Sequence, residues 1–206
     1  GTFKAAYTGS VTLTDNHTLA QLKAINNATT GTITLNDYSV ALSGTSADLS
    51  AALSGTFTAA YAGSVTITDA HNLAQLKAIN NATTGTITLS DYSVALQGTP
   101  SDVVAALSGT FSATYTGNIF FNAAHTQAQL NAVDAATTGI INLFQGGGSN
   151  KDLIGTAAQL ISQLAGTNNF SGNITITDAP SLAQLKAIND ATTGTITLNV
   201  SNGALI

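Results

Sequence analysis

The amino-acid sequence predicts an α/β fold built from repeated β-α-β units. The first observation is a repeat of 54 residues, since Gly1–Ser54 and Gly55–Ser108 are identical at 43 of 54 positions. The second is that two-residue and three-to-four-residue apolar spacings alternate within each copy, as expected for strands and helices in turn. Together these observations predict units of about 27 residues, two to each repeat, stacked as a solenoid.

The repeat divides the chain into four copies that form a single array over residues 1–206. The copies are 1–54, 55–108, a divergent third copy at 109–171 and a partial fourth at 172–206. The third copy differs most between Phe144 and Asn169. Because the chain begins and stops part-way through a copy, we expect it to belong to a longer array.

Strands are predicted where apolar residues alternate with threonine or serine. The pattern is clearest in Ser64–Asp69 (SVTITD) and Gly85–Asp91 (GTITLSD). Such period-2 alternation is typical of a strand with one buried face. Tyr92–Leu96 (YSVAL) and Phe111–Tyr115 (FSATY) alternate similarly and are predicted as further strands.

Two helices are predicted in each full repeat. In the second copy, Leu73, Leu76 and Ile79 lie on one face of the first, and Val103, Ala106 and Leu107 on one face of the second. Gly55 and Gly109 stand where helix-ending glycines are common. A capping residue followed by Gln or Asp three positions later recurs at each start. These pairs are Thr18/Gln21, Asn72/Gln75, Thr126/Gln129, Ser181/Gln184, Thr45/Asp48, Thr99/Asp102 (with Pro100 between) and Thr156/Gln159.

The stacking of the units has two solutions. Strands repeat at about 4.8 Å and packed helices at about 8–10 Å, so one helix per strand forces a curved solenoid. Two strands per helix would give a straight two-layer ribbon with one sheet and helices on one face. Leu89–Tyr92 fits either the two-residue hairpin of the ribbon or a corner of the solenoid. The rule of right-handed crossovers favours the solenoid.

Composition excludes several classes of protein. Only 7% of residues are charged, the net charge is −5, and the five basic residues are scattered, which excludes a basic nucleic-acid-binding stripe. No apolar run approaches the roughly 18 residues of a membrane helix, so no membrane insertion is expected. The chain has no cysteine, which excludes disulfides and thiolate sites.

Threonines recur on the outward positions of the predicted strands. Regular Thr-x-Thr rows on a flat sheet resemble the surface of solenoid ice-binding proteins. However, the third copy has Phe120, Asn122, Ile140 and Asn142 at these positions. A plain solvated sheet face is therefore favoured, because threonine forms strands well. The rows are Thr12/Thr14, Thr66/Thr68, Thr175/Thr177, Thr32/Thr34, Thr86/Thr88 and Thr195/Thr197.

Histidines follow the turns after three predicted strands, at His17, His71 and His125. An Asp-x-His pair can bind a metal, but Ala123 replaces the aspartate in the third copy and Pro180 replaces the histidine in the fourth. We therefore interpret these histidines as solvated loop residues. Asp15, Asp69 and Asp178 are interpreted as turn or near-cap residues.

The segment Gly147–Ile154 nearly matches the calcium-binding nonapeptide GGxGxDxUx. Its candidate calcium ligands are Asn150 and Asp152. A single copy cannot complete a site that successive turns share, so a flexible loop is the favoured interpretation. We predict no catalytic residues, no resident metal and no cofactor, since the chain contains neither Glu nor Cys and no catalytic set recurs.

Two stretches of the chain resemble the tandem repeats of very large secreted or surface proteins of bacteria, including cyanobacteria. They are VTITDAHNLAQLKAINNATTG and, after it, YSVALQGTPSDVVAALSG. Those surface proteins are haemolysin-type calcium-binding or adhesin-like proteins. The resemblance covers almost the whole chain and implies an extracellular, non-enzymatic protein. The chain lacks the true calcium-repeat array of such proteins.

The sequence therefore predicts a non-enzymatic structural repeat module of a surface layer, adhesin stalk or filament, secreted or at the cell surface. Its expected partners are copies of itself or neighbouring repeats. The alternative function is a binding module that presents the threonine-rich face to polysaccharide or ice.

Overall fold

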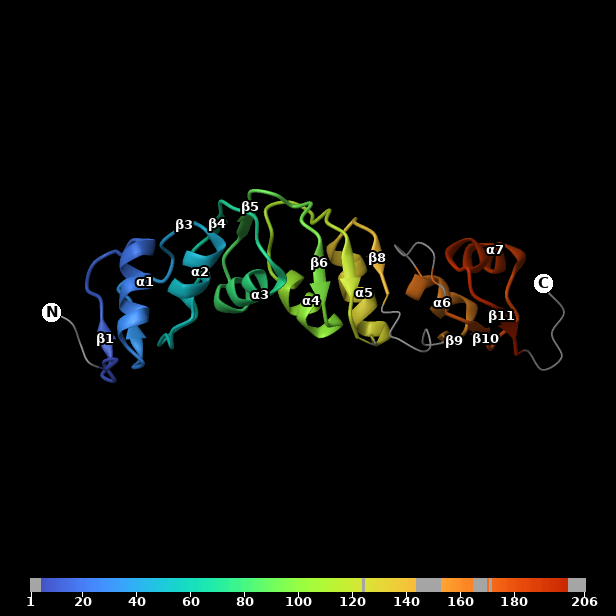
Figure 1. Ribbon diagram of the computed structural model, residues 1–206, viewed down its shortest axis with the longest axis horizontal. Coiled ribbons are helices and arrows are strands. Elements are labelled where there is room, and N and C mark those ends of the chain that lie inside the picture. The colour runs from blue at the N-terminus through green and yellow to red at the C-terminus, as the bar shows by residue number, and fades with distance from the viewer. Residues whose placement is uncertain (1–4, 124, 144–152, 165–169, 171, 200–206) are drawn as a thin grey trace. The chain divides into compact units, whose positions relative to one another are not determined.

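A computed structural model describes residues 5–123, 125–143, 153–164, 170 and 172–199. The chain divides into two compact units that interleave in sequence. Gly1–Val94 and Ala105–Tyr115 form the first unit, and Ala95–Val104 and Thr116–Ile206 form the second. Figure 1 labels the helices and strands.

The first unit contains two small parallel sheets. One has the order β1-β2, and the other has the order β3-β4-β5. Helix α2 packs against both α1 and α3 (Figure 1). The elements are β1 (Val11–Thr12), α1 (Leu19–Ala28), β2 (Ile33–Thr34), β3 (Leu42–Gly44), α2 (Ser46–Leu53), β4 (Val65–Ile67), α3 (Leu73–Ala82) and β5 (Ile87–Leu89).

The second unit also contains two parallel sheets, of order β6-β7-β8 and β11-β10-β9. Helix α4 (Pro100–Leu107) spans the boundary between the two units. The remaining elements are β6 (Leu96–Gly98), β7 (Ile119–Phe121), α5 (Gln127–Ala136), β8 (Ile141–Asn142), β9 (Leu153–Gly155), α6 (Ala157–Leu164), β10 (Ile174–Ile176), α7 (Leu182–Ala191) and β11 (Ile196–Leu198). None of the helices in the described ranges is long and apolar enough to span a membrane.

Each three-stranded sheet is a β-α-β-α-β motif, which confirms the predicted α/β class. In the first unit, Leu42, Val65 and Ile87 share one register row and are all buried. The intervening row, Ser43, Thr66 and Thr88, is partly or fully exposed. Apolar residues thus form the inner face of each sheet, as the period-2 pattern predicts.

Two helix lengths alternate, and each has its own start signal. The ten-residue helices α1, α3, α5 and α7 begin with a complete capping box, as predicted. The eight-residue helices α2, α4 and α6 follow Thr45, Thr99 and Thr156, whose hydroxyls accept the backbone N–H three residues on. We call a strand with its following eight-residue helix a short-helix segment.

The strand predictions were partly wrong. The strand predicted at 92–96 lies instead at Leu96–Gly98. The stretch 111–115 does not form a strand, and Phe111 makes an isolated β-bridge to Ile87. All strand pairs in the described residues are parallel, and they form four separate sheets. The hairpin at Leu89–Tyr92 and the one-sheet ribbon were therefore wrong. The hydroxyl of Tyr92 accepts the Leu89 N–H, and this bond turns the chain out of β5.

Gly55 and Gly109 follow helices as predicted, but for a different reason. A Cβ on Gly55 would lie 2.1 Å from the Asn26 side chain, and a Cβ on Gly109 would lie 1.7 Å from that of Asn80. Both glycines therefore leave space for an asparagine of the preceding ten-residue helix. The sequence pattern could not distinguish this close approach from an ordinary helix-ending glycine.

Aspartates after the second strand of a motif cap a helix of the preceding short-helix segment. The Asp69 carboxylate accepts the backbone N–H of Ser46 at 2.7 Å, and Asp178 accepts that of Ala157 at 2.7 Å. Both donors are the first residue of an eight-residue helix, where an acceptor stabilises the free N–H and the helix dipole. In the intervening copy the first residue is Pro100, which has no N–H, and Ala123 stands in place of the aspartate. Donor and acceptor are therefore lost together.

Replacement of Asp69 by alanine is expected to lower the free energy of unfolding by about 1 kcal/mol, because it removes the acceptor for the Ser46 N–H. In a Ser46→Pro background the same replacement should cost much less, since proline has no N–H to satisfy. Urea denaturation of the wild type, the two single variants and the double variant measures the interaction free energy between residues 46 and 69. An equal loss in both backgrounds would contradict this capping role, and Asp15→Ala serves as a surface control.

Candidate functional site

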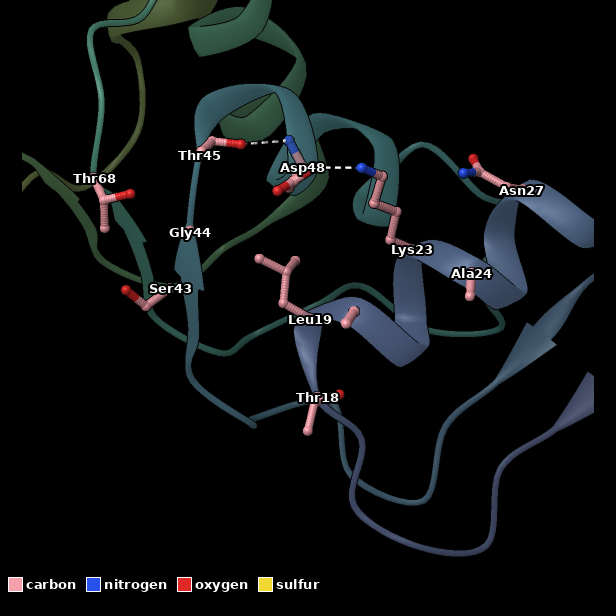
Figure 2. A pocket seen from close by; sticks show the side chains of 11 residues that line it. Thr18, Leu19, Lys23, Ala24, Asn27, Ser43, Gly44, Thr45, Asp48 and Thr68 are labelled. Atoms are coloured by element: carbon pink, nitrogen blue, oxygen red, sulfur yellow. Dashed lines mark hydrogen bonds and ion pairs between the residues drawn. The ribbon is translucent and has the colours of Figure 1, made fainter.

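A groove of about 740 Å³ lies between α1 and the short-helix segment β3-α2 (Figure 2). One side is the exposed face of α1 from Thr18 to Asn27, and the other is formed by Ser43, Gly44 and the start of α2. Its lining also includes Thr68, just after β4. The groove is therefore built entirely from residues of the first unit.

An ion pair closes this groove. Lys23 of α1 pairs with Asp48 in the first turn of α2, as Figure 2 shows. The hydrogen bond from Lys23, together with the one to Thr45, lowers the pKa of the Asp48 carboxyl below its ordinary value. The carboxylate thus stabilises the start of α2 and binds the preceding helix at the same time.

Two further contacts join α1 to the same segment. The Asn26 side-chain amide donates to the Ala51 carbonyl and to the Ser54 hydroxyl, both at 2.6 Å. A Cβ on Gly44 would lie 2.4 Å from a methyl carbon of Leu19, so the leucine in this position packs directly against the glycine. Lys23, Leu19 and Asn26 therefore join α1 to the short-helix segment β3-α2 along and beside the groove.

Two histidine–tyrosine pairs lie buried in the first unit. The Nε2 atom of His17 lies 3.1 Å from the Tyr61 hydroxyl, and that of His71 lies 3.2 Å from the Tyr115 hydroxyl. Each hydroxyl donates to a backbone carbonyl, that of Val40 at 2.5 Å for Tyr61. It follows that the tyrosine oxygen accepts its bond from the imidazole Nε2–H.

This arrangement holds the histidines neutral. The Nδ1 atoms of His17 and His71 are buried, and neither has a hydrogen-bond partner among the described residues. Burial lowers the pKa of both imidazoles, although Asp37 near His17 and Asp91 near His71 oppose the shift. Burial also raises the pKa of Tyr61 to about 12.

The interpretation of these histidines as solvated loop residues was wrong for the first two copies. His17 and His71 are each only 4% exposed. A signal was present in the sequence, because a tyrosine follows each of them by 44 residues. In the second unit Phe170 bridges Thr192 as Tyr61 bridges Thr83, so the hydroxyl is missing there. His125 is half-buried, and its ring lies 5.8 Å from that of Phe121.

The threonine rows lie on the outward sheet faces, as predicted. Thr66 and Thr88 are in register on neighbouring strands, beside Ser43. In the second unit the corresponding row is Gln97, Phe120 and Asn142. The threonine surface is therefore limited to short rows.

Asp69 and His71, which form an Asp-x-His pair in the sequence, bond to different partners. Asp69 bonds to the helix that starts at Ser46, while His71 bonds to Tyr115. Within the described ranges, no group of three or more histidine and aspartate side chains could hold a metal ion. The calcium candidates Asn150 and Asp152 lie outside the described residues.

Comparison with known proteins gives no relative for the chain: no family model, no curated protein and no solved structure matches it.

The buried histidines predict that acid destabilises the protein. Their folded pKa values are lowered, so the unfolded chain binds more protons, and the free energy of unfolding falls as the pH drops below about 6.5. The slope can reach about 1.4 kcal/mol per pH unit for each histidine. Urea denaturation between pH 7.5 and 5 measures this slope. The carboxyl groups of Asp37 and Asp91 stay charged in this range, because their pKa values are lowered.

The double variant His17→Gln, His71→Gln is expected to lose the contribution of these two histidines to the slope and to keep that of His125, whose pKa burial also lowers. The comparison is of slopes, so an overall loss of stability in the variant does not affect it. Equal slopes in the two proteins would contradict the role of the buried imidazoles.

Proposed function

We propose that the protein is a non-enzymatic structural repeat module. Its units stack as a solenoid, and the module forms part of a surface layer, an adhesin stalk or an extracellular filament. Its partners are neighbouring repeats or copies of itself.

The observation that carries this proposal is that the recurring polar side chains bind the neighbouring segments of the chain, before and after their own. Lys23 and Asn26 of α1 bind α2, and Asp69 binds the first N–H of the same helix. Helix α2 is therefore held by one segment before it and one after it. A unit of this size buries too little apolar surface to fold alone, and such contacts are what join repeats into an array.

Composition supports the same function. With 7% charged residues, the surface loses little solvation when it packs against a copy. Contacts between the end of one repeat and the start of the next are heterologous, and such contacts propagate unless they close into a ring. The resemblance to repeats of large bacterial surface proteins supports a secreted or cell-surface location and an extracellular, non-enzymatic role.

Small-angle X-ray scattering over a dilution series tests this proposal. At infinite dilution, a solenoid should have a radius of gyration well above the roughly 17 Å of a compact 206-residue domain. The apparent mass should rise with concentration, and electron microscopy should show polymers or sheets. A monomer of constant mass at the highest concentration would refute self-assembly, and a radius near 17 Å would refute the solenoid.

A second candidate function is the binding of polysaccharide, or of ice, on the threonine-rich sheet face. The observation that favours it is the row of Ser43, Thr66 and Thr88, whose side chains occur in register on three adjacent strands. Hydroxyls at the strand spacing can bond to a regular polar surface.

The variant Thr66→Tyr, Thr88→Tyr is expected to abolish this binding, because the larger side chains displace any ligand from the row. Co-sedimentation with insoluble polysaccharides, and the shape of growing ice crystals, measure the effect. The matched control is the double variant Ala183→Tyr, Ala187→Tyr, on exposed positions of helix α7 outside the threonine rows. Binding that is indifferent to the double substitution would reject this function.

A further inference from the structure

The last described helix presents an apolar groove of about 520 Å³. Six residues of α7 and β11 line it: Leu182, Leu185, Lys186, Asn189, Ile196 and Leu198. Leu182 is 68% exposed and Leu198 is 40% exposed, which is unusual for leucines in a repeat with an otherwise buried apolar face. Lys186 is also exposed, and among the described residues it forms an ion pair with Asp190 of its own helix.

The same side chains are covered in the first copy. α1 has the sequence LAQLKAINNA and α7 has LAQLKAINDA. Leu22, at the place of Leu185, is fully buried, and Leu35, at the place of Leu198, is only 5% exposed. The structure thus contains an example of the groove in its occupied form.

The short-helix segment β3-α2 contributes three contacts to this occupied form. Leu19 lies against Gly44, where a side chain would clash. Lys23 pairs with Asp48, and Asn26 donates to the Ala51 carbonyl. α7 has the corresponding side chains at Leu182, Lys186 and Asn189.

The third copy shows that the contact is specific. In α5 the lysine and asparagine of α1 are replaced by Asn131 and Asp134. In its partner α6, Gln159 replaces the aspartate, and the Ser162 hydroxyl donates to Asn131 at 3.2 Å. The ten-residue helix and its covering helix therefore change together, and α7 has the residues of α1 rather than those of α5.

We propose that the α7 groove is a docking site for a short-helix segment of the Leu42–Ser54 type. In the complex Leu182 contacts the glycine of that segment, Lys186 exchanges Asp190 for the segment's aspartate, and Asn189 donates to a carbonyl of its last helical turn. Segments of the α6 type, with glutamine in place of aspartate, bind less well. The proposal rests on the proposed structural function, since it names the type of repeat segment that α7 binds.

Binding of a labelled peptide of residues 41–54 to the full chain, followed by fluorescence anisotropy, tests this. We expect saturable binding that weakens about fivefold when Asp48→Gln is introduced into the peptide, as for the loss of one partly exposed ion pair. In the protein, Lys186→Asp should abolish binding of the natural peptide and restore binding of a peptide with Asp48→Lys. The matched control is Ala187→Asp, which places the same carboxylate at an exposed position outside the groove.

Absence of saturation by about 1 mM peptide, an affinity too weak for a specific site, would overturn the proposal. Binding that is equally weakened by Ala187→Asp, or that charge exchange fails to restore, would also overturn it, since the peptide would then not lie against Lys186. The scattering experiment is independent. Concentration-dependent assembly without peptide binding would leave the structural function standing, whereas peptide binding by a strictly monomeric chain would refute self-assembly alone.

Discussion

The structure depends on the fact that the helices of the short-helix segments are completed by neighbouring segments. The Asp69 carboxylate, which lies beyond the next strand, accepts the first N–H of α2, and the Asn26 amide of the preceding helix donates to a carbonyl in the last turn of α2. An eight-residue helix leaves most of its terminal backbone groups without partners, and each costs free energy if it is buried unpaired. The helix therefore needs the neighbouring segments to complete its hydrogen bonds. In an isolated short-helix segment these partners would be missing.

Local features of the fold could be predicted from the sequence, because their causes lie within a few residues. The capping boxes that start α1, α3, α5 and α7 join residues three apart, so their spacing alone defines the helix starts. The inner faces of β4 and β5 likewise follow from alternation over a few residues. The position of β6 was less predictable, because its residues 96–98 end in Gln-Gly and the alternation is clearer just before them.

The contacts that were missed join residues 20 to 44 positions apart. His17 was misinterpreted because its partner Tyr61 lies in the next copy, and only the recurrence of the 44-residue spacing relates them. Asp69 was interpreted as a turn or near-cap residue, but the helix start that its carboxylate caps lies 23 residues back, at Ser46. Gly55 illustrates the same point, since the atom that requires a glycine there belongs to Asn26. Local patterns contain no information on which distant side chain approaches.

Departures from the repeat are informative because they occur in matched pairs. Pro100 removes a donor where Ala123 removes its acceptor, and Asn131 replaces a lysine where Gln159 replaces its aspartate. Each pair joins two segments that are successive in the chain, so the constraint acts on the contact and not on either residue alone. At these two contacts the third copy has therefore diverged together with its neighbour. By the same reasoning, the residues on an uncovered helix face indicate which residues the segment that packs against that face has.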